Sequence, residues 1–509
     1  AEAALMAGVI RSPNNYSPYV NLEGAKQRRN RVLKNMLKQK TISAEEASLA
    51  MEAPIELEPL KSREYPFPYF VEFVKQQMLE DPKLGSTVSE RANTLFKGGL
   101  RIYTTIDPKK QRHAYDAVWS TLDRDGDPVG SLVSIEPKTG YIRAMVGGKD
   151  WKTQKLNLAS QGFRQPGSSF KPFVLAAALA DGMSISQTYR SGPAVIKLPG
   201  KNWVVNNSSG GGGRGVTTLH DATVFSINAV FARLIMDVGA DKVAELSRKM
   251  GVESPVEALP AIALGGLGHG VSALDMATAY STFANNGAHA KPIAITKVTD
   301  ASGNIIKENL TESEPTLDPA IAYLVTDTLK DVMRYGTGRR ASIGRPAAGK
   351  TGTAEHYGDA WFVGYTPELS TAVWVGYRDS NRWMTNVHGI TVQGGSFPAD
   401  IWRKYMSGAL SGTRPTDFEK PTKGLMGVRI CAEMAGYAAN QFCPDPKWAT
   451  FAKNAGPKRI CFTHTAPPNI AVPTVIGKTL DEAKIALSSS SLTANVIEID
   501  RGGIPANQV

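Results

Sequence analysis

The most informative stretch of this chain is residues 165–172, which read Gln165-Pro166-Gly167-Ser168-Ser169-Phe170-Lys171-Pro172. It contains the one Ser-x-x-Lys of the 509 residues, and the apolar run 173–180 that follows predicts a buried helix. A helix that begins near Gly167 places Ser168 in its first turn and Lys171 on the same face, so the amine can reach the hydroxyl. Free N–H groups at the helix start suit a serine that attacks an acyl group. The tetrapeptide also fits a serine N-cap followed by a solvated lysine. Other motifs in the chain are needed to distinguish a catalytic serine from a helix cap.

Two companion motifs separate these alternatives when they follow in the order Ser-x-Asn, then Lys-Thr-Gly. The chain has three Ser-x-Asn matches and two Lys-Thr-Gly matches, which begin at Ser12, Ser226, Ser302, Lys138 and Lys350. The match at Ser12 lies far upstream of the Ser-x-x-Lys and is set aside on position.

Local patterns set aside two more matches. Ser302-Gly303-Asn304 separates the strand-like runs 293–298 and 305–307, which predicts a hairpin turn. Lys138-Thr139-Gly140 follows Pro137, separates two alternating apolar runs and precedes the Ser-x-x-Lys. It is predicted to be a second hairpin turn.

The remaining matches lie in suitable settings. Ser226-Ile227-Asn228 begins the amphipathic run 229–235, which predicts a turn beside a helix. Lys350-Thr351-Gly352-Thr353 precedes the strand-like runs 360–365 and 371–377, so it is predicted to belong to a sheet. Three motifs in order and in these settings favour a serine acyl-transfer site.

From about residue 98 to residue 412 the chain resembles the transpeptidase domain of class A penicillin-binding proteins. Besides the three motifs, the resemblance rests on Tyr103-Thr104-Thr105-Ile106-Asp107, Arg164-Gln165-Pro166-Gly167-Ser168, Ala263-Leu264-Gly265-Gly266, Ala279-Tyr280-Ser281-Thr282-Phe283-Ala284-Asn285-Asn286-Gly287 and Gly394-Gly395-Ser396-Phe397-Pro398-Ala399-Asp400-Ile401-Trp402. It implies an α/β (α+β) fold of the penicillin-binding-protein/β-lactamase type. An antiparallel sheet flanked by helices is expected, with small accessory domains.

The resemblance also implies a chemistry, in which Ser168 attacks the penultimate D-Ala carbonyl of a peptidoglycan stem peptide ending in D-Ala-D-Ala. The resulting acyl-enzyme would be captured by an amine of a neighbouring stem. Lys171 would be the base, and it can act only if the site lowers its pKa from about 10.4, to which Lys350 would contribute. The other implied roles are proton transfer by Ser226, amide binding by Asn228 and carboxylate binding by Lys350, Thr351 and Thr353. Gly352 is also expected among the substrate-binding residues, and the N–H groups of Ser168 and Thr353 are expected to form an oxyanion hole.

The implied partners are stem peptides, lipid II-derived glycan, β-lactam antibiotics, the membrane through a helix upstream of this chain, and proteins of cell-wall division or elongation. No metal or organic cofactor is expected. Nucleic acid is excluded as a partner, because the basic residues lack aromatic interleaving and a recognised binding motif.

Three other functions share the motifs. A β-lactamase would need a carboxylate that directs water at the acyl-enzyme. A strict carboxypeptidase differs only in using water as the acceptor, and a non-catalytic sensor would use the same pocket for signalling. Retention of Lys171, Ser226 and Lys350 together favours turnover.

Residues 1–54 resemble the tail of the glycosyltransferase domain that precedes the transpeptidase in this family, on the evidence of Glu2-Ala3-Ala4-Leu5, Ala7-Gly8 and Pro13-Asn14-Asn15-Tyr16-Ser17-Pro18. Residues 55–97 are expected to be a linker region. The sequence shows neither a signal peptide nor a membrane-spanning apolar run. We therefore expect a fragment of a bifunctional, membrane-anchored extracytoplasmic parent, itself inert as a glycosyltransferase.

The net charge of +11 is concentrated near the start of the chain. Seven basic residues with no acid between them are Lys26, Arg28, Arg29, Arg31, Lys34, Lys38 and Lys40. With Val32, Leu33, Met36 and Leu37 on one side, they predict a basic amphipathic helix. Either it lies near anionic lipid headgroups or it is a solvated face of the glycosyltransferase remnant.

Residues 413–465 form a linker and a small segment that holds all three cysteines, Cys431, Cys443 and Cys461, with His464 nearby. Spacings of 12, 18 and 3 residues do not make the paired Cys-x-x-Cys arrangement of a zinc knuckle. One disulfide and a spare thiol are expected instead. Residues 466–509 resemble the start of a PASTA domain, with a helix capped by Thr479 and Glu482.

Overall fold

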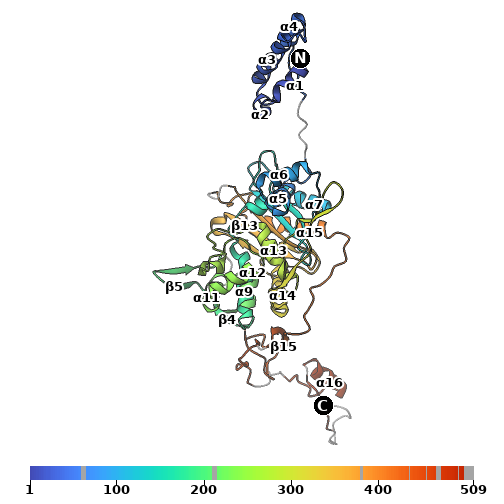
Figure 1. Cartoon of the computed structure of the whole chain (residues 1–509). Coiled ribbons are helices and arrows are strands. Elements are labelled where there is room, and N and C mark those ends of the chain that lie inside the picture. Colours follow the sequence, from blue (N-terminus) through green and yellow to red (C-terminus); the bar gives the residue numbers. More distant parts are fainter. Residues whose placement is uncertain are drawn as a thin grey trace. The chain divides into compact units, whose positions relative to one another are not determined.

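The structure is a computed structural model that describes residues 1–58, 65–208, 215–378, 382–434, 436–453, 455–465, 472–490, 492–497 and 509. The chain divides into two compact units, Ala1–Pro66 and Phe67–Val509. Figure 1 shows the elements of each unit along the chain.

The first unit is helical, with α1 (Glu2–Val9), α2 (Pro13–Tyr16), α3 (Leu22–Lys38) and α4 (Ala44–Glu52). Helix α3 is the basic helix predicted from the sequence, but Arg29 does not join its solvated face. The Arg29 side chain is fully buried, and its guanidinium donates to the carbonyls of Met51 and Ala53, each at 2.7 Å. Arg29 therefore satisfies carbonyls that α4 leaves free at its end, a structural role that its neighbours on the charged run do not share.

The second unit begins with two helices, α5 (Pro68–Glu80) and α6 (Val88–Lys97), joined by the short helix η1 (Pro82–Leu84). Phe70, Val74 and Met78 of α5 are buried in the main core. Residues 55–97 were expected to be a linker region. In the structure, the second half of this range forms helices that pack on the domain that follows. The apolar side chains of α5 lie at helical spacing and need a partner surface.

A five-stranded sheet forms the centre of this unit, in the order β12-β13-β14-β2-β3. Its strands are β2 (Val129–Ile135), β3 (Ile142–Val146), β12 (Ala348–Thr353), β13 (Asp359–Tyr365) and β14 (Ser370–Gly376), and every neighbouring pair is antiparallel. The turn 138–140 joins β2 to β3, so this Lys-Thr-Gly match is the predicted hairpin turn. The antiparallel sheet expected from the resemblance is confirmed.

Both faces of the sheet are covered, because alternate side chains enter two different cores. On β13, Trp361 and Val363 belong to the core that contains α13 (Ala273–Ala284). Phe362 belongs to the core that contains α7 (Pro108–Trp119) and α15 (Phe397–Ala409). A strand buried on both faces reads as a continuous apolar run rather than an alternating one, as β13 does.

The remaining elements surround this sheet and its helices. The other helices around the sheet are α8 (Leu158–Gln161), η2 (Gly167–Phe170), α9 (Lys171–Ala180), α10 (Leu219–Val224), α11 (Asn228–Val238), α12 (Ala240–Lys249), η3 (Pro260–Leu264), α14 (Pro319–Arg334), η4 (Arg339–Ala341) and η5 (Glu355–Tyr357). Helix α9 is the buried helix predicted after Ser168, since nine of its ten residues, from Lys171 to Leu179, are buried.

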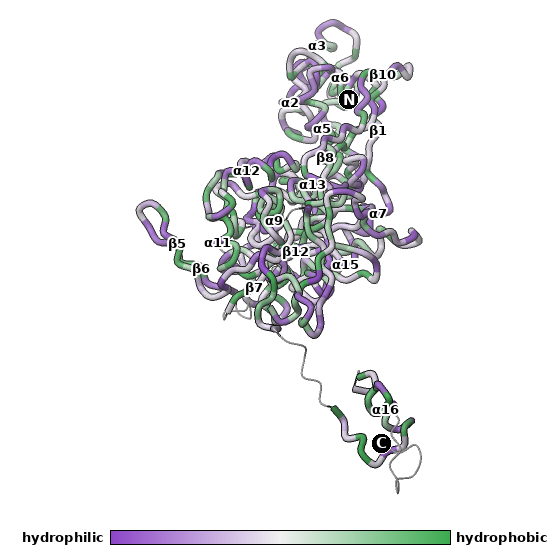
Figure 2. Tube along the Cα trace, turned by 90° about the horizontal axis from the view of Figure 1, so that it is seen from below, coloured by the Kyte–Doolittle hydropathy of each residue, from purple (hydrophilic) through white to green (hydrophobic). Residues whose placement is uncertain are grey.

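Small antiparallel sheets complete the unit. They comprise β1 (Arg101–Thr104) with β9 (Ile295–Thr299) and β10 (Ile305–Glu308), β8 (Ala288–Ala290) with β11 (Ser313–Pro315), β4 (Thr188–Arg190) with β7 (Val216–Thr218), and β5 (Ala194–Leu198) with β6 (Lys201–Val205). The turn 302–304 joins β9 to β10, as predicted. Hairpin β5–β6 projects from the body of the unit (Figure 2).

The part of the chain that follows α15 contains the strand pair β15 (Leu425–Ile430) and β16 (Lys447–Ala452), and helix α16 (Leu480–Ser489). The predicted capping box is present on α16, where Thr479 and Glu482 each accept from the other's backbone N–H. The residues quoted for the PASTA-like resemblance, 472–483, are described, whereas residues 466–471, 491 and 498–508 of this stretch lie outside the described part. No helix among the described residues is both long enough and apolar enough to span a membrane.

The expected disulfide is wrong. Cys431, Cys443 and Cys461 are all free and buried. The fold brings the three thiols together with His464 instead of pairing two of them.

Candidate active site

Ser168 lies in a tight turn that leads directly into the buried helix α9. Residues 167–170 form the 3-10 helix η2, and α9 begins at Lys171. The predicted helical start is thus confirmed, with a tighter first turn than an α-helix. Ser168 keeps part of its surface accessible, whereas Lys171 is fully buried. A nucleophile has to meet its substrate, so this difference in exposure fits the two predicted roles.

Glycines let this turn approach two other segments closely. Gly167 has a φ of 54°, and a Cβ placed on it would lie 2.6 Å from the carbonyl oxygen of Thr353. A Cβ on Gly352 would lie 2.2 Å from the carbonyl oxygen of Pro166, and one on Gly265 would lie 2.1 Å from that of Gly167. Only residues without a side chain allow such approaches. These glycines therefore let residues 165–170, which we call the nucleophile turn, lie close to strand β12 and to Gly265.

Ser226 links the two lysines of the site. Its hydroxyl lies 2.9 Å from Lys350 Nζ and 3.2 Å from Lys171 Nζ. Lys171 Nζ also donates to the Ser226 carbonyl at 2.8 Å and to Asn228 Oδ1 at 2.7 Å. The structure therefore joins all three motifs through one hydroxyl, although they are far apart in the sequence.

In the described residues, no hydrogen bond joins Lys171 Nζ to Ser168 Oγ. The amine is instead held by Ser226 and Asn228. Contacts of catalytic bases are often long before substrate binds, so this arrangement leaves Lys171 a candidate base.

Both lysines are buried, and burial favours the neutral amine. Burial lowers the pKa of Lys350 to about 7. Burial, and after it the charge of Lys350, holds the pKa of Lys171 well below its usual value. The sequence predicted a lowered pKa for Lys171 with a contribution from Lys350, and the structure shows that burial is the larger cause and the charge of Lys350 the smaller one.

The Ser-x-Asn motif lies in the turn between α10 and α11, as predicted. Ser226 has a φ of 58°, an uncommon backbone conformation for a residue with a side chain, and Asn228 is the first residue of α11. Asn228 Nδ2 donates to the Asn206 carbonyl at 3.2 Å. Strain at a residue that contacts two functional groups is common where a side chain must be aimed.

Strand β12 is the edge strand of the sheet, with one side open toward the nucleophile turn. Ala354 N–H bonds to the Asp359 carbonyl, and this fixes which residues of β12 bond to β13. By antiparallel alternation, the N–H groups of Thr351 and Thr353 point to the free edge. The N–H of Thr353 therefore faces the side from which Ser168 approaches.

Side chains hold the threonines of this edge strand in place. Thr351 Oγ1 hydrogen-bonds to Thr337 Oγ1 at 2.8 Å, and Thr353 Oγ1 accepts from the N–H of Gly394 at 3.1 Å. Hydroxyls held in this way present a fixed surface to a ligand lying along β12.

Comparison with known proteins accounts for this arrangement. Residues 130–382 match the family described as the penicillin binding protein transpeptidase domain. Penicillin-binding protein 1A of Aquifex aeolicus (strain VF5) is 31% identical over 513 residues, which cover 84% of this chain and 68% of that protein. This chain belongs to the class A penicillin-binding proteins.

Other penicillin-binding proteins agree with this membership. Penicillin-binding protein 2D of Bacillus subtilis (strain 168) is 31% identical over 91% of this chain and 66% of that protein. The solved structure of PonA1 from Mycobacterium tuberculosis in complex with penicillin V is 31% identical, with a TM-score of 0.63, and covers 71% of this chain and 97% of that one. The chain spans between about half and two thirds of the length of the first curated relatives it matches.

Sequence reasoning missed three residues that hold the nucleophile turn of this penicillin-binding protein. Gln165 bonds through its side-chain amide to both backbone groups of Leu267, at 2.6 and 2.8 Å. Tyr280 donates to the Ser169 carbonyl at 2.5 Å, and Trp361 Nε1 donates to the Gln165 carbonyl at 2.9 Å. Gln165 and Tyr280 lie in family-like stretches, but no local pattern shows which distant backbone group they reach.

Proposed function

We propose that this chain is a serine D,D-transpeptidase that cross-links peptidoglycan stem peptides through an acyl-enzyme on Ser168. The observation that supports this most strongly is the Ser226 hydroxyl, which contacts two buried lysines beside the nucleophile turn. Membership of the family supports β-lactams as ligands that acylate the same serine.

Lys171 acts as a neutral amine, which has two N–H groups and one lone pair. Its Nζ contacts the Ser226 carbonyl, Asn228 Oδ1 and, at the longer distance of 3.2 Å, Ser226 Oγ, so the two N–H groups bond to the first two and the lone pair remains to accept a proton. That lone pair accepts the Ser168 proton as Oγ attacks the penultimate D-Ala carbonyl. When the tetrahedral intermediate collapses, the proton passes through Ser226 to the departing D-Ala amine. The acceptor amine then attacks the ester, loses a proton along the same path, and returns Ser168 to its free form.

The N–H groups of Ser168 and Thr353 are the donors for the oxyanion. Ser168 is at the start of a helical segment, and the N–H of Thr353 points to the free edge of β12. Donors fixed before the reaction stabilise the negative charge that develops on the carbonyl oxygen. The close approach that Gly167 allows brings the two segments within reach of one oxygen atom.

The edge of β12 binds the substrate's terminal carboxylate. Lys350 supplies the positive charge, the hydroxyls of Thr351 and Thr353 supply donors, and Gly352 lets the turn that holds Ser168 lie close to these residues. Asn228 binds the backbone amide of the donor peptide. A penicillin carries a carboxylate in the corresponding position, so it uses the same contacts.

The proposed function can be tested by incubating the chain with a thioester mimic of the stem peptide and a D-amino-acid acceptor. Thiol release, hydrolysis and aminolysis are followed separately. A transpeptidase gives an aminolysis product whose yield rises with acceptor concentration. Hydrolysis alone would show a carboxypeptidase, and a single equivalent of thiol released with neither hydrolysis nor aminolysis afterwards would show a sensor. Rapid hydrolysis of penicillin itself would show a β-lactamase, and each of these three results would contradict the proposal.

Lys350→Ala is expected to slow acylation by ligands that carry the carboxylate far more than by analogues that lack it. One charge-assisted hydrogen bond contributes about 1.5–3 kcal/mol, which corresponds to roughly one to two decades in rate. The measurement is the second-order acylation rate for a matched ligand pair. Lys138→Ala, in the exposed hairpin turn with the same Lys-Thr-Gly sequence, should leave both rates unchanged. Equal losses for both ligands would contradict the assignment.

The second-order acylation rate is expected to be bell-shaped in pH. Lys171 has to be neutral, so the rate rises as pH increases through the lowered pKa of this group. Lys350 has to be charged, so the rate falls as pH increases through a pKa of about 7. Because the two lysines interact, the apparent pKa values read from the acid and alkaline limbs of the profile belong to the lysine pair and not to either residue alone. In Lys350→Ala the alkaline limb should disappear. A limb unchanged in that variant would assign it to another group.

We also propose a wider organisation for the parent protein. Residues 1–54 are the tail of a glycosyltransferase domain, residues 98–412 are the transpeptidase domain, and the parent is bifunctional. The resemblance of the N-terminal stretches and the partial coverage of longer relatives support this division. The parent is extracytoplasmic and anchored in the cell membrane, with stem peptides and lipid II-derived glycan as partners. Failure of the purified chain to polymerise lipid II, while it still binds penicillin, is the corresponding test.

A further inference from the structure

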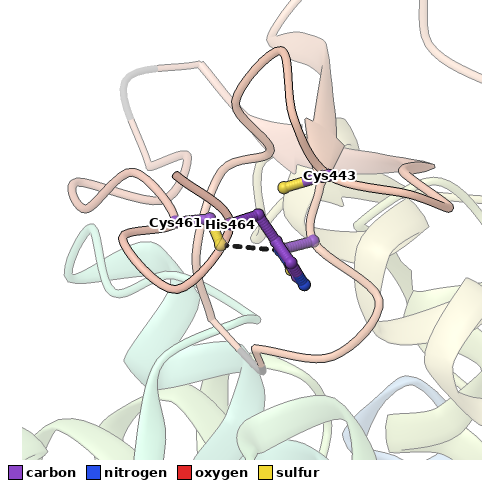
Figure 3. A group of neighbouring side chains, drawn as sticks. Cys443, Cys461 and His464 are labelled. Carbon is purple, nitrogen blue, oxygen red and sulfur yellow. Dashed lines mark hydrogen bonds between the residues drawn. The ribbon is translucent and has the colours of Figure 1, made fainter. Parts of the chain in front are cut away.

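The three cysteines of the chain and one histidine meet in the segment that follows the transpeptidase region. Each of Cys431, Cys443, Cys461 and His464 offers one ligand atom, and these four atoms lie within 4.8 Å of one another. His464 Nδ1 is 3.2 Å from Cys461 Sγ and 3.6 Å from Cys431 Sγ. Figure 3 shows the side chains of Cys461 and His464 next to each other on one loop, with that of Cys443 nearby on another part of the chain.

We propose that these four residues bind a structural Zn²⁺ ion. Zinc has Zn–S distances of about 2.3 Å and Zn–N distances of about 2.0–2.1 Å, so the ligand atoms of a tetrahedral site lie roughly 3.5–3.8 Å apart. The observed separations need only a small adjustment to reach these values. Thiolates with one imidazole favour zinc over the hard cations, and four protein ligands leave no open position for catalysis.

The hydrogen bonds around His464 orient its ring toward the thiols. Its Nε2 lies 3.0 Å from a carboxylate oxygen of Glu433. With the proton on Nε2, the lone pair of Nδ1 is available on the side of the three sulfurs. A carboxylate behind a metal-binding histidine is a frequent arrangement, because it fixes the tautomer and makes the ligand more basic.

Other contacts hold the ligand loops at this spacing. Asn440 Nδ2 donates to the carbonyls of Cys461 and His464, at 2.8 and 2.7 Å. These two hydrogen bonds fix the loop that carries two of the four proposed ligands.

Residues 425–465 bury few apolar side chains of their own. Between residues 425 and 465, the buried residues in the described part are Cys431, Cys443, Phe451, Ala455 and Cys461. Three of these five are proposed ligands. Strands β15 and β16 also pack against the main core through Phe451 and partly buried neighbours, so the strand pair has support besides the cysteines. The loops that carry the cysteines bury little else, and their thiols are free, so a bound metal would supply the cross-link that a disulfide does not.

Zinc content is the first test. The full chain is loaded with Zn²⁺ under reducing conditions, dialysed against metal-free buffer and assayed by elemental analysis. About one zinc per chain is expected. Cys443→Ser and His464→Ala should retain only background zinc, whereas His113→Ala, an exposed histidine on α7, should retain the full amount. Glu433→Gln should bind zinc about 10–100-fold more weakly. Penicillin labelling of Ser168 in each variant verifies that the catalytic domain is folded.

Two measurements need no variant. Replacement by Co²⁺ should produce the intense visible absorption of a tetrahedral cobalt–thiolate site. Bound zinc should protect three thiols from alkylation, and a chelator should expose them. Wild-type protein that labels with penicillin but retains no zinc would overturn the proposal. A disulfide between two of the cysteines that persists after reduction and zinc loading would also overturn it.

Discussion

Ser168→Ala should abolish covalent labelling by penicillin, since no other serine of the chain has a lysine three residues further on. The expected effect is the largest in the molecule, because the acyl-enzyme cannot form without this oxygen atom. Mass spectrometry of the treated wild-type protein should find one adduct, on the peptide that contains Ser168.

The control is Ser302→Ala. This substitution removes an exposed serine from the Ser-x-Asn match that lies outside the site, in the turn between β9 and β10. It should label at the wild-type rate. An adduct that persists in Ser168→Ala would show that another nucleophile reacts and would end the assignment.

Lys171→Met should reduce the second-order acylation rate by about 10²–10⁴-fold, the range that a general base contributes. Methionine keeps most of the buried volume and removes the amine. The loss should be similar for ligands with and without a carboxylate, in contrast to Lys350→Ala, because the proton is transferred in both cases. A loss confined to carboxylate ligands would show that Lys171 acts in binding.

The same variant should change how stability depends on pH. Native Lys171 has a pKa well below its unfolded value of about 10.4, so between these values the unfolded chain binds the extra proton. Wild-type stability therefore falls as pH decreases in this range, by up to about 1.4 kcal/mol per pH unit for this group. Removal of the amine should make the variant gain stability relative to wild type from pH 9 to pH 7, as measured by denaturant unfolding. An unchanged difference would mean that native Lys171 is charged.

Sequence patterns were sufficient to sort the repeated motifs. Lys138 and Ser302 lie in hairpins, and the runs on either side of each showed this before any tertiary information. Lys350 precedes two apolar runs that form β13 and β14, and the run after Ser226 forms α11. The capping box of Thr479 and Glu482 was also visible in the sequence. In each case the signal lies within a few residues of the feature it predicts.

Patterns failed where one residue of a run behaves differently from its neighbours. Arg29 resembles the other basic residues of α3, yet its guanidinium is buried against the end of α4. The cysteines are spaced unlike a zinc knuckle, yet their sulfurs converge. The apolar face of α5 was assigned to a linker because its partner surface is distant in the sequence.

Helical spacing, strand alternation and motif order were enough to select Ser168 and Lys171 as the candidate nucleophile and base, because backbone geometry sets the distance between near neighbours whatever the rest of the chain does. The family was indicated by the resemblance of the motifs and of whole stretches of sequence. The tertiary structure alone placed the Ser226 hydroxyl between two lysines, turned the N–H of Thr353 toward Ser168, and gathered three thiols around His464. These features depend on contacts between residues far apart in the chain. Their separation in space is set by the packing of whole elements against one another, which local preferences do not specify.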